Sequence, residues 1–156
     1  MTFSRFTSAL CAASLTALSF TAVAQTETRL ASQAIHCAAV FTVLAQVNAA
    51  DAALSARLNK AVDIFSDVYS REFTPQATKS EAGQRRQSAL ADIKSTWASR
   101  APQFLESGVI CGAWAEGFLE QGDWYKHIPV YPKVVAMNVR SQYQAMAEDA
   151  LKRWNP

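Results

Sequence analysis

Apolar residues recur at every third or fourth position along most of this chain, which is the spacing that gathers side chains on one face of an α-helix. No stretch alternates β-branched and polar residues in the way that a half-buried strand requires. We therefore predict an all-α fold, a small bundle of four to five helices. The expected helices cover residues 27–48, 51–73, 80–99, 102–121 and 132–153.

The number of helices depends on Pro102, which either kinks one long helix or begins a new one. Proline has no backbone N–H and its ring clashes with the preceding turn, so it is tolerated mainly in the first turn of a helix. We expect a break between two helices over residues 99–101.

The segment over residues 27–48 is the most apolar part of the predicted bundle. Between Ile35 and Val47 its only polar residues are His36, Thr42 and Gln46. So wide an apolar surface predicts a helix that is covered on more than one side, or one that also contacts a partner.

Gly108 and Gly112 lie four positions apart in the segment over residues 102–121. Residues without a side chain at that spacing let another backbone approach closely. We expect the approaching helix to be the one over residues 27–48. Glu116 and Glu120, one turn apart near the end of the segment, are expected to be exposed and without a catalytic role.

The chain has 156 residues, half of which are hydrophobic. That is too short for two ordinary domains, and too apolar for a disordered chain. With 15 Lys and Arg against 13 Asp and Glu, the net charge is only +2. So small a charge provides no general attraction to polyanions, and we expect no nucleic-acid partner.

Residues 1–24 have the pattern of a secretory signal peptide, in which Arg5 precedes an apolar stretch and small residues such as Ala22 and Ala24 form a cleavage site. A membrane anchor is the alternative, but five Ser and Thr residues interrupt the stretch, which is also shorter than the about 20 residues that a span needs. We predict cleavage before Gln25, a single domain over residues 25–156, and export to the periplasm of a Gram-negative cell or to the secreted space. No later stretch is expected to reach membrane-spanning length without charged residues.

Cleavage would leave Cys37 and Cys111 as the only cysteines. Disulfides persist outside the cytosol, and one pair of cysteines allows only one intramolecular connectivity. We predict one interhelical disulfide between Cys37 and Cys111, the alternatives being two buried thiols or an intermolecular bridge. In the chain-entropy model, closing a loop of this length stabilises the fold by at most about 4.5 kcal/mol.

Candidate catalytic and cofactor-binding residues are scarce. Only His36 and His127 remain after cleavage, and the chain has no HExxH, Glu-x-x-His, GxxxxGK[ST] or GxSxG motif. We predict no catalytic constellation, no metal site and no cofactor. The alternative is a haem between the helices, with His36 and either Met137 or Met146 as axial ligands.

The loop over residues 123–131 combines aromatic and polar side chains. Tryptophan and tyrosine offer a large contact area with a polar tip, which suits them to interfaces. We predict a binding surface here, the alternative being a lid whose rings pack over the end of the bundle. Its members are Trp124, Tyr125, Lys126, His127 and Tyr131.

These features together predict an exported, non-catalytic helical-bundle protein with an accessory role, which binds a protein partner in the envelope or outside the cell. The alternative function is a bundle that holds a small apolar ligand or haem between its helices. An enzyme is the third class, since no nucleophile with its base is apparent in the sequence.

Overall fold

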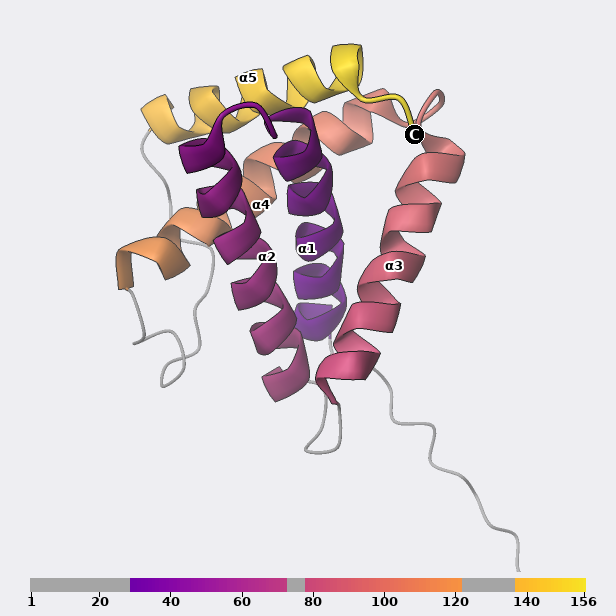
Figure 1. Cartoon of the computed structure of the whole chain (residues 1–156), viewed down its shortest axis with the longest axis vertical. Coiled ribbons are helices and arrows are strands. Elements are labelled where there is room, and N and C mark those ends of the chain that lie inside the picture. The colour runs from indigo at the N-terminus through magenta and orange to yellow at the C-terminus, as the bar shows by residue number, and fades with distance from the viewer. Residues whose placement is uncertain (1–28, 73–77, 122–136) are drawn as a thin grey trace, which may run out of the picture.

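Five helices make up the part of the chain that the computed structural model describes, which is residues 29–72, 78–121 and 137–156 (Figure 1). No strand occurs within those ranges, and the predicted all-α bundle is confirmed. The helices are α1 (Arg29–Val47), α2 (Ala52–Glu72), α3 (Lys79–Thr96), α4 (Ala101–Gln121) and α5 (Met137–Arg153).

The starts of α2 and α3 are fixed by capping side chains. The carboxylate of Asp51 accepts a hydrogen bond from the backbone N–H of Leu54 at 3.0 Å, so α2 begins directly after it. Thr78 caps α3 in a reciprocal arrangement, because its hydroxyl accepts from the N–H of Glu81 while the carboxylate of Glu81 accepts from the N–H of Thr78. This capping box starts α3 at Lys79, one residue before the predicted start.

Helix α1 lies in the middle of the bundle. It stands between α2 and α3, α4 passes behind, and α5 lies across one end (Figure 1). Each of the other four helices contacts α1, and most of its residues from Ala31 to Ala45 are buried. The wide apolar surface of α1 is therefore covered on several sides, which was the first of the two predicted explanations.

The expectation that no later stretch reaches membrane-spanning length was wrong for α1. Residues 30–50 contain no Asp, Glu, Lys or Arg, and within the described part of the chain α1 is the one helix long and apolar enough to cross a membrane. The core helix of a soluble protein and a signal sequence meet the same criterion. In this bundle, the residues that give α1 its hydropathy contact the other helices.

Aromatic rings fill the space between α1, α2 and α4. Phe65 of α2 lies 5.4 Å from Trp114 and 5.7 Å from both Phe41 and Phe118, measured between ring centroids. Beside them, Cys37 and Cys111 link α1 to α4. None of the described residues is a buried polar or charged residue. Burial of apolar surface is therefore the main stabilising contribution in this core, and the disulfide adds a covalent link.

Gly108 and Gly112 of α4 face α5, and the expectation that they accommodate α1 was wrong. A Cβ atom added at Gly112 would lie 2.1 Å from the ring of Tyr143, and one at Gly108 would lie 2.8 Å from the Cβ of Ala147. Both neighbours belong to α5. Cys111 is next to Gly112 in the sequence, but adjacent residues of a helix point in directions about 100° apart. Cys111 therefore faces α1, where it bonds to Cys37, while Gly112 faces α5.

Candidate functional site

Of the predicted site residues, the structure describes the two cysteines. Cys37 and Cys111 form the predicted disulfide, with their Cα atoms 5.2 Å apart. The predicted binding surface over residues 124–131 lies outside the described residues, so it stays a prediction.

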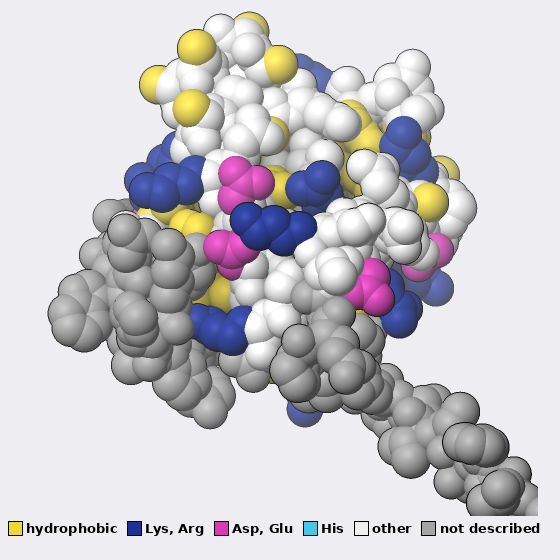
Figure 2. Space-filling model, turned by 60° about the horizontal axis from the view of Figure 1, so that its bottom comes forward, with side chains coloured by type: hydrophobic (Ala, Val, Ile, Leu, Met, Phe, Trp, Pro, Cys, Tyr) yellow, Lys and Arg dark blue, Asp and Glu magenta, His cyan; other side chains and the backbone are white. Residues whose placement is uncertain are grey.

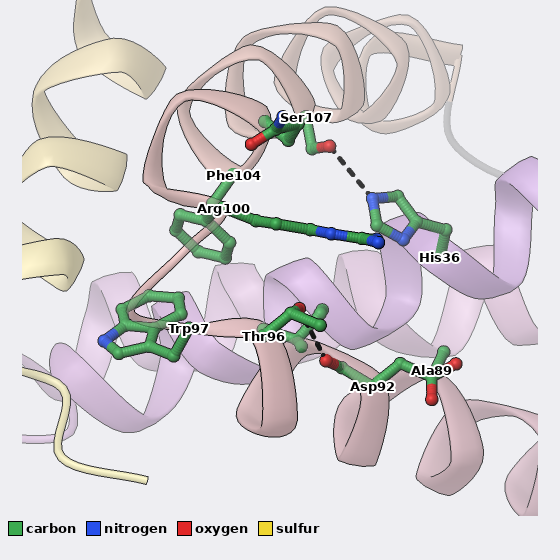
Figure 3. Close-up of a pocket in the computed structure, with 10 residues that line it drawn as sticks. His36, Ala89, Asp92, Thr96, Trp97, Arg100, Phe104 and Ser107 are labelled. Atoms are coloured by element: carbon green, nitrogen blue, oxygen red, sulfur yellow. Dashed lines mark hydrogen bonds between the residues drawn. The ribbon is translucent and has the colours of Figure 1, made fainter.

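A pocket of about 230 Å³ opens between α1, α3 and the first turns of α4 (Figure 3). That volume corresponds to seven or eight water molecules at about 30 Å³ each. It is below the about 300 Å³ at which pockets for drug-sized ligands begin. The pocket therefore suits a small molecule.

The break between α3 and α4 creates this pocket. The carbonyl of Thr96 accepts hydrogen bonds from the backbone N–H groups of Ser99 and Arg100, which closes a turn after α3. A new helix then starts at Ala101, with Pro102 in its first turn as predicted. The break covers residues 97–100, so it begins two residues before the predicted 99–101. Since α4 leaves the end of α3 at an angle (Figure 1), side chains from both helices line the space between them.

One side of the pocket carries a hydrogen bond between His36 and Ser107, whose Nε2 and Oγ atoms are 2.9 Å apart. Partial burial of the imidazole lowers the pKa of His36 below its usual value, because the charged form loses hydration. The lowered pKa favours the neutral ring, which donates to or accepts from the hydroxyl of Ser107 according to its tautomer.

Aromatic rings form the opposite end of the pocket. Trp97 packs edge to face on Phe104, with ring centroids 4.7 Å apart, and on Trp154 at 4.6 Å. The indole N–H of Trp154 donates to the side-chain oxygen of Gln46 at 3.0 Å, which ties the end of α5 to α1. Contacts on both sides hold Trp97 in place, so the pocket has a rigid apolar wall.

Two opposite charges, those of Arg100 and Asp92, also line the pocket. The side chain of Arg100 extends across the pocket toward His36 (Figure 3). Neither Arg100 nor Asp92 forms an ion pair with any residue that the structure describes. Among the described residues, both charges therefore face the pocket without a side-chain partner.

The contact between Ser107 and His36 is also the one that a serine nucleophile makes with its general base. Acyl transfer further needs a group that orients the imidazole and N–H donors that face the developing oxyanion. No carboxylate bonds to His36 within the described ranges, and Ser107 lies inside α4, where backbone N–H groups bond within the helix. The arrangement suits binding better than acyl transfer.

Glu116 is half-buried, and the expectation that it is exposed was wrong. Its carboxylate accepts a hydrogen bond from Arg57 at 2.5 Å and from the hydroxyl of Tyr143 at 2.6 Å. Burial of the phenol, together with this hydrogen bond, raises the pKa of Tyr143. The three side chains join α2, α4 and α5 and do not line the pocket, so their role is structural.

A second, open cleft of about 440 Å³ lies between α2 and α3. It is lined by Asp63 and Asp67 as well as by Lys79 and Arg86. Figure 2 shows a face of the molecule on which Lys and Arg side chains lie beside Asp and Glu instead of forming a patch of one sign. Such mixed charge does not select an anion or a cation.

Of the residues named for the haem alternative, His36 lines the pocket and Met146 does not. The side chain of Met137 lies outside the described residues, so that pair stays untested. Nowhere in the described ranges do three His, Cys, Asp or Glu residues gather in a way that could hold a metal ion.

Sequence reasoning missed the two unpaired charges and Ser107. His36 and Ser107 are separated by 71 positions, and no motif connects them. The one available signal was Trp97, which the helical periodicity places on the inner face of its helix. No protein-family model, curated protein or solved structure matches this chain. Its function is therefore inferred from the residues of the pocket.

Proposed function

We propose that this chain is an exported, non-catalytic binding protein of the cell envelope or the secreted space, and that it holds a small ligand in the pocket between α1, α3 and α4. The observation that carries the proposal is the lining of this pocket. An imidazole, a hydroxyl and two opposite charges, neither of them paired within the described ranges, converge on one concave site with aromatic walls. A few converging polar groups on apolar walls are typical of ligand sites.

Export is supported by two independent features of the chain. The first is the signal-peptide pattern over residues 1–24. The second is the bond between Cys37 and Cys111, since structural disulfides persist in oxidising compartments and are rare in the cytosol.

The described surface favours a small ligand over a large protein partner. Ile110 is the one large hydrophobic residue that is exposed in the described ranges, at 39%. A large contiguous apolar patch on a surface marks a site of protein interaction, and the described residues show none. The pocket is therefore the better supported site, and a protein partner stays tied to the predicted surface over residues 124–131.

A pocket-filling variant tests this function. Ala89 lines the pocket and is half-buried, whereas Ala91, two positions along α3, is exposed and does not line it. Protein expressed from the full chain is screened against small metabolite-like compounds by thermal unfolding. A ligand present at about 100 times its dissociation constant stabilises the fold by about 2.7 kcal/mol. We expect such shifts in the wild type and in Ala91→Phe, and their loss in Ala89→Phe.

Two results would overturn the proposal. One is a screen in which every stabilising compound acts equally on Ala89→Phe and Ala91→Phe, or in which no compound stabilises the wild type. The other is hydrolysis of an activated ester such as p-nitrophenyl acetate that Ser107→Ala abolishes, because the hydrogen bond to His36 would then serve catalysis.

A further inference from the structure

The charges of the pocket differ in sign, and one comes from a helix while the other comes from the turn that follows it. Asp92 belongs to α3, and Arg100 immediately precedes α4. Both line the same space of about 230 Å³, and neither is paired with another side chain in the described ranges. His36 adds no charge at neutral pH because burial lowers its pKa. The polar lining therefore combines one cation and one anion.

This combination disfavours ligands that carry a single charge. A simple anion would pair with Arg100, but the carboxylate of Asp92 would repel it. A simple cation would pair with Asp92, but the guanidinium of Arg100 would repel it. Like charges in proximity oppose binding, and opposite charges favour it. A ligand with one carboxylate and one ammonium pairs with both residues. The planar guanidinium also matches a carboxylate with two parallel hydrogen bonds.

The rest of the pocket fits a compact apolar group. Trp97 and Phe104 present an aromatic wall that neighbouring rings hold in place. Ile93 and Ala89 add aliphatic surface on the α3 side. The volume leaves room for one short side chain and excludes a large cofactor.

We infer that the ligand of this pocket is a small zwitterion with an apolar body, of the class that free hydrophobic amino acids represent. Arg100 binds its carboxylate, Asp92 binds its ammonium group, and Trp97 with Phe104 contacts its side chain. The hydroxyl of Ser107 and the imidazole of His36 lie beside the carboxylate end. This inference rests on the proposed function and adds the chemical class of the ligand.

Three matched probes test the charge requirement by calorimetric titration of the protein expressed from the full chain. They are L-phenylalanine, 3-phenylpropionate and 2-phenylethylamine, which share a phenyl group on a two- or three-carbon chain. The first carries both charges, the second only the carboxylate and the third only the ammonium. We expect L-phenylalanine to bind at least about tenfold more tightly than either single-charge probe, since each lost charge pair removes a charge-assisted hydrogen bond.

Two variants test which residue binds the carboxylate of the ligand and which binds its ammonium group. We expect Arg100→Gln and Asp92→Asn each to weaken L-phenylalanine binding at least about tenfold. Arg100→Gln should leave the affinity for 2-phenylethylamine unchanged or higher, and Asp92→Asn should do so for 3-phenylpropionate. Glu106→Gln and Arg140→Gln are the controls, because both residues are exposed and neither lines the pocket. All four positions are exposed, so circular dichroism should report an intact fold in every variant.

The inference falls if L-phenylalanine shows no binding, if the single-charge probes bind as tightly, or if Arg100→Gln and Asp92→Asn behave like the controls. Failure of the inference is distinguishable from failure of the proposed function. If the thermal screen finds another ligand that Ala89→Phe excludes, the pocket is a binding site and only the ligand class is wrong.

Discussion

Replacing Gly112 by alanine would place one carbon atom where the ring of Tyr143 lies. An alanine Cβ would come within 2.1 to 2.6 Å of three ring carbons, well inside van der Waals contact. The ring has little freedom to move away. Its hydroxyl donates to Glu116 at 2.6 Å, and its other side packs on Phe41 with ring centroids 5.7 Å apart.

The expected magnitude combines one favourable and two unfavourable terms. Alanine is better than glycine inside a helix by about 1 kcal/mol. Overpacking a filled interface costs about 1–3 kcal/mol, and displacing the hydroxyl of Tyr143 from a carboxylate costs about 1.5 kcal/mol or more. We expect Gly112→Ala to lower the free energy of unfolding by about 2 kcal/mol.

Gly83→Ala is the matched control, because it makes the same chemical change inside α3. A Cβ atom at Gly83 would meet nothing within 4 Å, so only the helix propensity changes, and we expect stabilisation by about 0.5–1 kcal/mol. Urea unfolding followed by circular dichroism measures both values. A Gly112→Ala variant that is as stable as Gly83→Ala would refute the close approach of α4 and α5.

Three further changes test other parts of the structure. Reducing the bond between Cys37 and Cys111 should lower the free energy of unfolding by about 4 kcal/mol, because the two cysteines are 74 positions apart and the loop between them is released. A urea midpoint that is the same with and without reductant would contradict this. Thr78→Ala should destabilise the protein by about 1 kcal/mol through loss of the capping box, whereas the neighbouring Ser80→Ala should change the urea midpoint little. As pH falls below about 6.5, the free energy of unfolding should decrease, because the pKa of His36 is lowered in the fold and the unfolded chain binds the proton more readily. His36→Gln should remove this part of the pH dependence. A pH profile of the variant that is identical to that of the wild type would refute the expectation.

Local rules account for most of what the sequence predicted correctly. The helical periodicity located all five helices, and the break before Pro102 follows from the missing N–H of proline. Asp51, the first residue of the range predicted for the second helix, caps α2. The pairing of Cys37 with Cys111 followed from counting cysteines, not from geometry.

The incorrect predictions concern which helix faces which. Gly108 and Gly112 face α5 instead of α1, and Glu116 is half-buried by side chains of two other helices. Periodicity reports that a residue lies on a given face of its own helix. It does not report which partner covers that face, since several helices of similar apolar content could pack there.

The sequence by itself determined the class of fold, the approximate ranges of the helices and the cysteine pair, because each depends on residues within a few positions or on simple counting. Only the tertiary structure decided which residues meet in the pocket. His36 comes from α1, Asp92 from α3 and Ser107 from α4. No motif or regular spacing in the sequence relates these three residues to one another. They meet because α4 departs from α3 at a hydrogen-bonded turn and packs against α1, which leaves a pocket with two opposite charges that no other described residue pairs with.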